Sequence, residues 1–239
     1  MIVSIHQPGY IPWHGFFHRL ALSDIHVFFD TSQFEKNGFN NRVKIRNAQG
    51  EQWLTVPIQA KGRFGNNRIA EAEISQTVDW RRVHLRTLAL SYGKSRFYSS
   101  LAPFLESLYS VPWVALGPLN IFAIEHLAGL LGIGCRFVRA SELAVSGVKS
   151  DLVLNLCRAV GATTYISGVN GRDYLEKSAF AAVGISLRFQ AYREPRYPQL
   201  HGGFRQYMSV IDLIANCGPD AYPLMMAGQD SIDTGSVFE

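Results

Sequence analysis

The first thirty residues constrain the fold of this chain more than any other stretch. A short apolar run, residues 2–6, ends in a polar turn that begins His6-Gln7-Pro8-Gly9, and a helix-like segment follows. A second apolar run, residues 25–29, then ends at Asp30. Strand, loop, helix and strand in this order predict a βαβ unit. Ligands of open α/β sheets bind at the carboxyl ends of the strands, so we expect a site near His6 and Gln7.

The remainder of the chain extends this pattern. Residues 44–57 alternate as a hairpin, with Ala48-Gln49-Gly50 as its turn. The section 79–132 has the helical period of three helices that form an insertion or a cover over the first unit. Strands and helices then alternate, with expected strands at 135–139, 163–168 and 185–190 and expected helices at 150–160, 174–182 and 208–216. The sequence therefore predicts one α/β domain over residues 1–239, with a doubly wound, mostly parallel, Rossmann-like sheet, a hairpin and a helical middle section.

Charge and cysteine content limit the classes of function. Lys and Arg number 23 against 19 Asp and Glu, with no long basic run, so nucleic acid is not expected as a partner, although an aminoacyl-tRNA donor is left open. The cysteines Cys135, Cys157 and Cys217 are widely separated and odd in number, which predicts neither a disulfide framework nor a metal site. With no basic n-region and no membrane-length apolar run, we expect a cytoplasmic enzyme or binding protein. The oligomeric state is not predicted.

The loop after the first strand is similar to a known phosphate-binding loop. Pro12-Trp13-His14-Gly15-Phe16-Phe17 resembles the stretch that opens the nucleotide-binding unit of HUP-type nucleotidyltransferases and adenylate-forming ligases, where an HxGH motif at a helix start holds triphosphate. The resemblance implies a HUP-like core, nucleotide binding by His14 and Gly15, and ATP with magnesium as cofactors. Phe16 and Phe17 stand where the second histidine is expected, which weakens the case for ATP cleavage unless His18 or His6 takes that role.

The sequence as a whole resembles the WbqC-like family from residue 1 to about residue 219. The stretches that carry the resemblance are Ile5 to Phe17, Ser23 to Asp30, Trp53 to Pro57, Tyr165 to Gly168 and Met208 to Leu213. Members occur among polysaccharide biosynthesis genes and have been suggested to be glycine transferases. The resemblance implies aminoacyl transfer onto an amine, with a small-molecule acyl donor and an amine acceptor as partners, in polysaccharide or specialised-metabolite biosynthesis.

Residue types and positions select the candidate site. A histidine at a strand end can accept a proton from an attacking amine, and a carboxylate such as Asp30 can bind an ammonium group or magnesium. The predicted catalytic residues are His6, Gln7 and Asp30. The predicted substrate- or nucleotide-binding residues are Tyr10, His14, Gly15, Asn41, Arg42, His84, Ser167, Gly168 and Tyr197. Each also has an ordinary structural alternative, such as a satisfied core histidine, a turn cap or a solvated charge.

Three hypotheses about function follow. The first is amide formation by acyl or aminoacyl transfer to an amine, from a pre-activated donor, with His6 as base. The second is an ATP-dependent adenylate-forming ligase or nucleotidyltransferase that uses the helix start at His14. The third is a non-catalytic protein that binds a small molecule or a sugar nucleotide.

Overall fold

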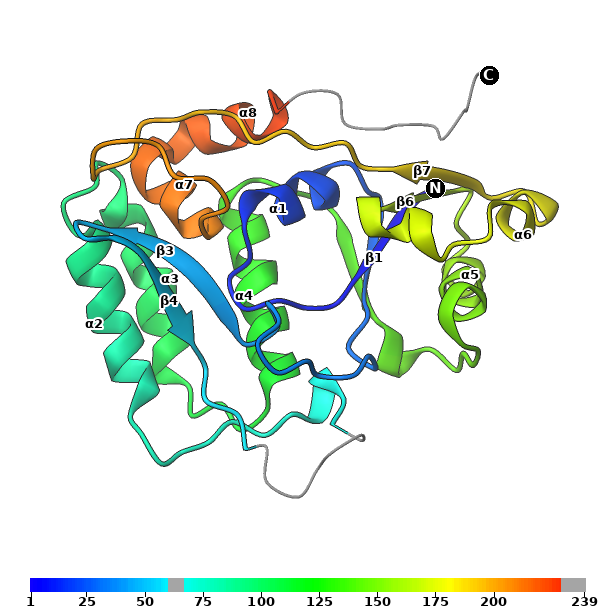
Figure 1. The fold of residues 1–239 in the computed structure, drawn as a ribbon, viewed down its shortest axis with the longest axis horizontal. Coiled ribbons are helices and arrows are strands. Elements are labelled where there is room, and N and C mark those ends of the chain that lie inside the picture. Colours follow the sequence, from blue (N-terminus) through cyan, green and yellow to red (C-terminus); the bar gives the residue numbers. More distant parts are fainter. Residues whose placement is uncertain (60–66, 229–239) are drawn as a thin grey trace.

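The computed structural model describes residues 1–59 and 67–228 and contains a five-stranded parallel sheet (Figure 1). Its strands lie in the order β5-β2-β1-β6-β7, and every neighbouring pair is parallel. Their bounds are Ile2–His6 (β1), Ile25–Phe28 (β2), Arg136–Arg139 (β5), Thr164–Ser167 (β6) and Ser186–Phe189 (β7). The predicted α/β class and doubly wound parallel sheet are confirmed. The chain leaves β1 for β2 on one side and returns to the other side of β1 as β6, which leaves a topological switch point between β1 and β6.

Helices cover both faces of this sheet, which is why its central strands are apolar on both sides. Val3 and Ile5 of β1 pack in one core cluster with α5 (Lys149–Ala159) and α6 (Lys177–Ala182). Phe28 of β2 packs in a second cluster with α1 (His14–Ala21) and α4 (Leu116–Leu130). Crossovers that move in opposite directions from β1 place their helices on opposite faces, as right-handed connections require.

The hairpin and the helical middle section stand to one side of the sheet (Figure 1). The predicted hairpin is confirmed as β3 (Arg42–Asn47) and β4 (Gly50–Thr55), whose strands pair antiparallel. The three predicted helices are also present, as α2 (Trp80–Tyr92), α3 (Tyr98–Ser110) and α4. The last two helices, α7 (Val210–Cys217) and α8 (Ala221–Met226), contact α1. The extent of the domain stays a prediction.

One predicted helix is shorter in the structure. Residues 174–182 were expected to be helical throughout, but a 3₁₀ turn occupies Val169–Asp173 and α6 begins only at Lys177. The backbone N–H of Glu176 donates to Ser150 Oγ at 3.0 Å, and this contact holds the chain in an extended conformation just before the helix. As a result the 3₁₀ turn, rather than a helix, follows the carboxyl end of β6.

Membrane insertion was not expected from the sequence. None of the helices in the described residues combines the length and the hydropathy needed to cross a bilayer.

Candidate functional site

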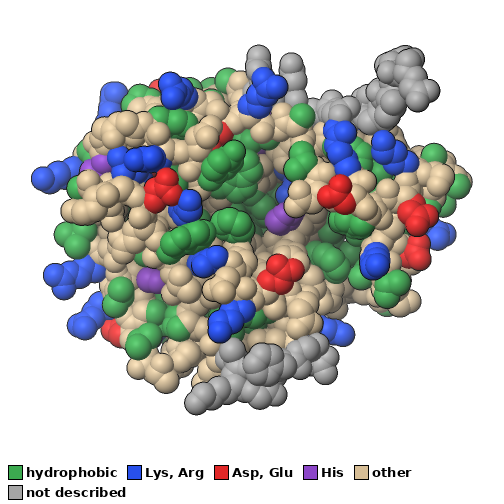
Figure 2. All heavy atoms as spheres, in the orientation of Figure 1, with side chains coloured by type: hydrophobic (Ala, Val, Ile, Leu, Met, Phe, Trp, Pro, Cys, Tyr) green, Lys and Arg blue, Asp and Glu red, His purple; other side chains and the backbone are tan. Residues whose placement is uncertain are grey.

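A cavity of about 620 Å³ opens at the switch point, beside the carboxyl ends of β1 and β6. Figure 2 shows a hollow near the middle of the molecular face, with hydrophobic side chains along its edges. Four stretches of the chain form the walls: residues 5–19, 35–44, 165–174 and 190–207. Of the predicted site residues, the cavity brings together His6, Gln7, Tyr10, Gly15, Arg42, Ser167 and Gly168.

The strand end of β1 presents a histidine with a defined tautomer. His6 Nδ1 lies 2.8 Å from the carbonyl oxygen of Gln7. A carbonyl oxygen can only accept a hydrogen bond, so in the neutral ring Nδ1 carries the proton and Nε2 keeps its lone pair. The edge of Phe16 packs against the ring, with 5.5 Å between the ring centroids, and no described residue bonds to Nε2. His6 therefore presents an unengaged basic nitrogen at the cavity.

The surroundings of His6 disfavour its charged form. Desolvation, followed by the positive charge of Arg19, lowers the pKa of His6 to about 3, and the hydrogen bond to Gln7 acts in the opposite direction. The ring is exposed at the cavity, where water lessens the desolvation. At neutral pH His6 is uncharged, and a proton acceptor must be uncharged to act.

In the same wall of the cavity, the Gln7 side chain is bonded by Asn40, which lies just before β3 of the hairpin. Gln7 Oε1 accepts a hydrogen bond from Asn40 Nδ2 at 3.1 Å, and both residues line the cavity. The predicted residue Asn41 does not line it, because its Nδ2 donates to the carbonyl of Val56 at 2.8 Å. Asn40, and not its neighbour Asn41, therefore reaches the cavity.

Tyr10 and Arg42 line the cavity, but their polar ends have partners within the protein. The Tyr10 hydroxyl lies 2.9 Å from Nδ1 of His84 and 2.5 Å from the hydroxyl of Tyr109. The predicted residue His84 is thus buried behind Tyr10 rather than at the cavity. The Arg42 guanidinium donates to the carbonyl of Asn37 and lies 4.3 Å above the centre of the Trp53 ring.

The start of α1 is more closed than the phosphate-loop resemblance predicts. The Trp13 ring lies on Gly15, where a Cβ atom would come within 2.4 Å of the ring, so only glycine fits beneath this aromatic wall. His14 is fully buried and does not line the cavity. Its Nδ1 bonds to the Tyr192 hydroxyl and its Nε2 to Glu194 Oε1, each at 2.6 Å. Both ring nitrogens are therefore engaged inside the protein.

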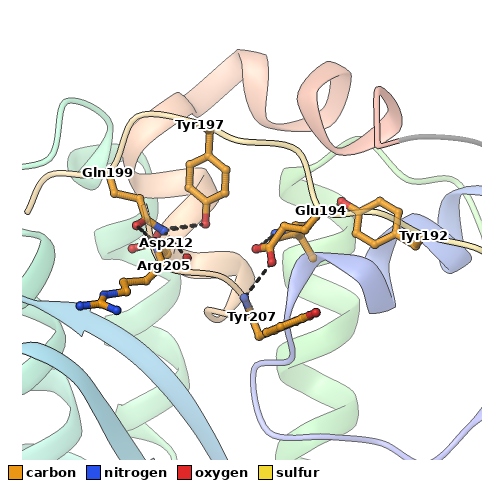
Figure 3. Close-up of polar contacts among 8 residues, drawn as sticks. Tyr192, Glu194, Tyr197, Gln199, Arg205, Tyr207 and Asp212 are labelled. Atoms are coloured by element: carbon orange, nitrogen blue, oxygen red, sulfur yellow. Dashed lines mark hydrogen bonds and ion pairs between the residues drawn. The ribbon is translucent and has the colours of Figure 1, made fainter. Parts of the chain in front are cut away.

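The segment between β7 and α7 supplies these partners and crosses the outer side of α1 (Figure 3). Glu194 Oε2 also accepts the backbone N–H of Tyr207 at 2.8 Å. The predicted binding residue Tyr197 is buried, and its hydroxyl donates to Asp212 Oδ2 at 2.8 Å. Tyr192 and Tyr207 line the cavity, whereas Tyr197 does not.

Asp30 also lies away from the cavity. Its Oδ1 accepts the backbone N–H of Ser141 at 2.9 Å and its Oδ2 accepts the Ser141 hydroxyl at 2.6 Å, which ties the end of β2 to the end of β5. Only 2% of the residue is exposed, so these bonds have little competition from water. The geometry favours a structural role over the predicted catalytic one.

We expect Asp30→Asn to lower the free energy of unfolding by about 1 to 3 kcal/mol, because one of the two Ser141 donors loses its acceptor. Catalytic turnover per folded molecule should stay unchanged. Urea denaturation measures the first effect. A loss of turnover without a loss of stability would restore the catalytic role of Asp30.

The cavity is also lined by side chains that the sequence pattern did not single out. They are Arg19 of α1, Tyr165 of β6, Tyr174 and Gln190 after β7. The sequence carried one clue: Arg19 follows Gly15 by four residues, and residues four apart share a helix face. The others reach the cavity only because parallel strands β1, β6 and β7 align their carboxyl ends.

The expected cofactors do not fit the residues predicted to hold them. His14 would have to release Glu194 to contact a triphosphate, and Asp30 would have to release Ser141 to bind magnesium. Among the residues that the structure describes, no group of three or more His, Cys, Asp or Glu side chains is arranged as metal ligands. No step below is therefore assigned to ATP or to a metal ion.

Fold and cavity together define an α/β protein of the doubly wound class with a cavity at the switch point of the sheet. The chain belongs to the WbqC-like protein family, whose model matches residues 7–223. It is 34% identical over 223 residues to "Uncharacterized protein Rv1507c" of Mycobacterium tuberculosis (strain ATCC 25618 / H37Rv), covering 92% of this chain and 95% of that protein. No solved structure matches the chain. The expected family membership is confirmed.

Proposed function

We propose that this protein transfers an acyl or aminoacyl group from a pre-activated donor to a small amine, forming an amide. The observation that carries the proposal is His6, whose Nδ1 bond to Gln7 leaves Nε2 unprotonated at a cavity of substrate size. An amine nucleophile must lose a proton as it attacks, and a neutral imidazole nitrogen is a suitable acceptor. Membership of the WbqC-like family supports the same chemistry.

The proposed reaction forms a bond between the amine nitrogen and the acyl carbon and breaks the bond between that carbon and its leaving group. The amine lone pair attacks the acyl carbon, and the carbonyl electrons move onto oxygen. His6 Nε2 takes the proton from the amine nitrogen, the carbonyl re-forms, and the leaving group departs with the electron pair of its bond to the acyl carbon. The protonated ring can then return that proton to the leaving group. Trp13, Tyr192 and Tyr207 supply aromatic walls against which the acyl donor would lie.

The alternative from another class, a non-catalytic binding protein, has one observation in its favour. A histidine whose pKa is lowered by desolvation and by Arg19 is a weaker base than an ordinary one, because efficient general bases have pKa values near the working pH. In that case the cavity would bind a small molecule without turning it over. The same substitution separates the two functions.

We expect His6→Gln to lower turnover about 10²-fold to 10⁴-fold, the range that a general base contributes, while the affinity for donor stays similar. The assay offers a glycyl N-acetylcysteamine thioester and a panel of amino sugars and small amines, and it measures thiol release and the amide by mass spectrometry. His126→Gln is the matched control, because His126 is an exposed histidine whose Nδ1 also contacts a backbone carbonyl, that of Phe122 at 3.0 Å.

Three results would count against this proposal. Equal turnover rates for His6→Gln and wild type would show that His6 is not the general base. If neither protein releases thiol with any acceptor, the non-catalytic binding function is favoured. Amino-acid-dependent exchange of pyrophosphate into ATP would instead support the ligase alternative. Wild-type activity with the thioester and no exchange is the result that we expect.

A further inference from the structure

A buried cation lies in the cavity wall without a counter-charge. Arg19 lines the cavity and is only 5% exposed. Within the described part of the chain it forms no ion pair, its guanidinium donates no hydrogen bond, and its Nε is buried without a partner. Removing a charge from water costs several kcal/mol unless a partner compensates for it. The uncompensated charge of Arg19 thus lies in the wall of the cavity that a ligand would occupy.

Arg46 is a second buried arginine, and its hydrogen bonds are those of a residue with a structural role. Arg46 is 6% exposed, and its terminal nitrogens donate to the carbonyls of Asn47, His201 and Gly202 at 3.3, 3.1 and 2.9 Å. Those three bonds fix two separate stretches of chain. Arg19 fixes none, although it is equally buried. The difference indicates that the donors of Arg19 are kept for a group that is not part of the described protein.

The backbone around Arg19 is shaped to leave room for its guanidinium. A Cβ atom on Gly168 would lie 2.9 Å from Arg19 Nη1. Gly168 has φ −71° and ψ 167°, a conformation that any residue adopts, so its dihedral angles do not require glycine. A Cβ atom there would instead require the end of the Arg19 side chain to shift. The Ser167-Gly168 turn at the end of β6 thus lies directly against the guanidinium at the cavity wall.

We propose that Arg19, seated against Gly168, binds an anionic group, a carboxylate or a phosphate, of the molecule that enters the cavity. The planar guanidinium matches both anions by paired hydrogen bonds. That this molecule is the acyl donor or the amine acceptor rests on the proposed function. The substrate would then carry one negative group on the β6 side, and the rest of it would lie beside the aromatic residues Trp13, Tyr192 and Tyr207.

Anion binding at Arg19 has a consequence for the base. The positive charge of Arg19 is one of the causes that lower the pKa of His6. A bound anion neutralises that charge, so the pKa of His6 rises toward its ordinary value and Nε2 becomes a stronger proton acceptor. Because desolvation is the larger cause of the lowered pKa, anion binding is expected to restore part of the basicity of His6.

The test follows the His6 ring by NMR while inorganic phosphate or acetate is added, with sodium chloride keeping the ionic strength constant. We expect saturable binding of at least one of the two anions and a rise in the pKa of His6. Arg19→Gln should raise that pKa without anion and weaken binding about 10-fold to 100-fold, the loss expected for charge-assisted bonds. Whichever of phosphate and acetate binds more tightly identifies the class of the natural group.

Three further variants make the test specific. Arg19→Lys keeps the charge but loses the paired geometry, so its affinity should be intermediate. Gly168→Ala keeps the charge but displaces the guanidinium, so it should also weaken binding. Arg158→Gln removes an exposed arginine of α5, outside the cavity, and should leave affinity within about twofold of wild type because exposed charges at a distance are screened.

The outcomes separate this proposal from the proposed function. Binding of neither anion, or equal binding by wild type and Arg19→Gln, overturns the anion site. Wild-type affinity in Gly168→Ala overturns the role assigned to Gly168. If anion binding depends on Arg19 but no thioester releases thiol, the anion site stands and the acyl-transfer function is wrong. If Arg19→Gln turns over the thioester as fast as wild type, acyl transfer stands and the anion site at Arg19 is wrong.

Discussion

Acidification from pH 6.5 to about 4 is expected to destabilise this protein by on the order of 6 kcal/mol through two buried histidines. Burial lowers the pKa of His18 to about 4, with His14 and Arg19 contributing, and burial lowers the pKa of His84 to about 4 despite a hydrogen bond to the Thr55 backbone. Both side chains lie within the core, at 1% and 4% exposure. The loss is comparable with the whole stability of an ordinary domain.

The sign follows from proton binding. Above pH 6.5 both histidines are neutral in the native and unfolded states, and they add no pH dependence. Between pH 6.5 and about 4 the unfolded chain binds two protons that the native chain does not, so the free energy of unfolding falls by about 1.4 kcal/mol per pH unit for each histidine. Below about 4 the native rings also protonate and these two contributions level off.

Urea denaturation at pH 7.5, 6.5, 5.5 and 4.5 measures this slope. His84→Gln should flatten it by about 1.4 kcal/mol per pH unit, since one of the titrating groups is gone. His126→Gln changes an exposed histidine and should leave the slope as in wild type. A free energy of unfolding that stays constant from pH 6.5 to 4.5 would mean that His18 and His84 are not buried in their neutral forms.

The second large effect is expected at Glu194. Its carboxylate and the ring of His14 have side-chain exposures of 1% and 0% and lie 2.6 Å apart. Replacing Glu194 by Ala leaves His14 Nε2 and the backbone N–H of Tyr207 without their acceptor inside the protein. We expect a loss of about 3 kcal/mol, which for a chain of this size corresponds to a fall in Tm of about 6 to 12 °C.

The variant Glu194→Gln separates the contribution of side-chain packing from that of the hydrogen bonds to His14 and Tyr207. Glu194→Gln keeps the side-chain volume and one oxygen acceptor, so its Tm should lie between those of wild type and Glu194→Ala. Scanning calorimetry gives the Tm of each protein. Because Tyr192 and Tyr207 line the cavity on either side of this contact, Glu194→Ala should also weaken anion or thioester binding. A wild-type Tm for Glu194→Ala would show that the contact with His14 is energetically neutral.

The sequence determined much of the architecture because the relevant information is local. Alternating apolar runs and helical periods placed β1, α1, β2 and the later strands, and the turn chemistry at Ala48-Gln49-Gly50 placed the hairpin. From the rule that ligands bind at the carboxyl ends of parallel strands, the sequence also placed His6, Gln7, Ser167 and Gly168 at one site. These residues lie at strand ends, where position along the chain fixes position in space.

The tertiary structure decided which of the remaining polar residues face that site. His14, Asp30, His84 and Tyr197 have the residue types of a functional site, but each is used by a distant partner, respectively Glu194, Ser141, Tyr10 and Asp212. Arg19 has no such partner and faces the cavity. A sequence shows which groups are able to hydrogen-bond, whereas only the folded chain shows which of them are already satisfied from far along the sequence. Arg19 differs from the buried Arg46 in that its terminal nitrogens donate to none of the described residues.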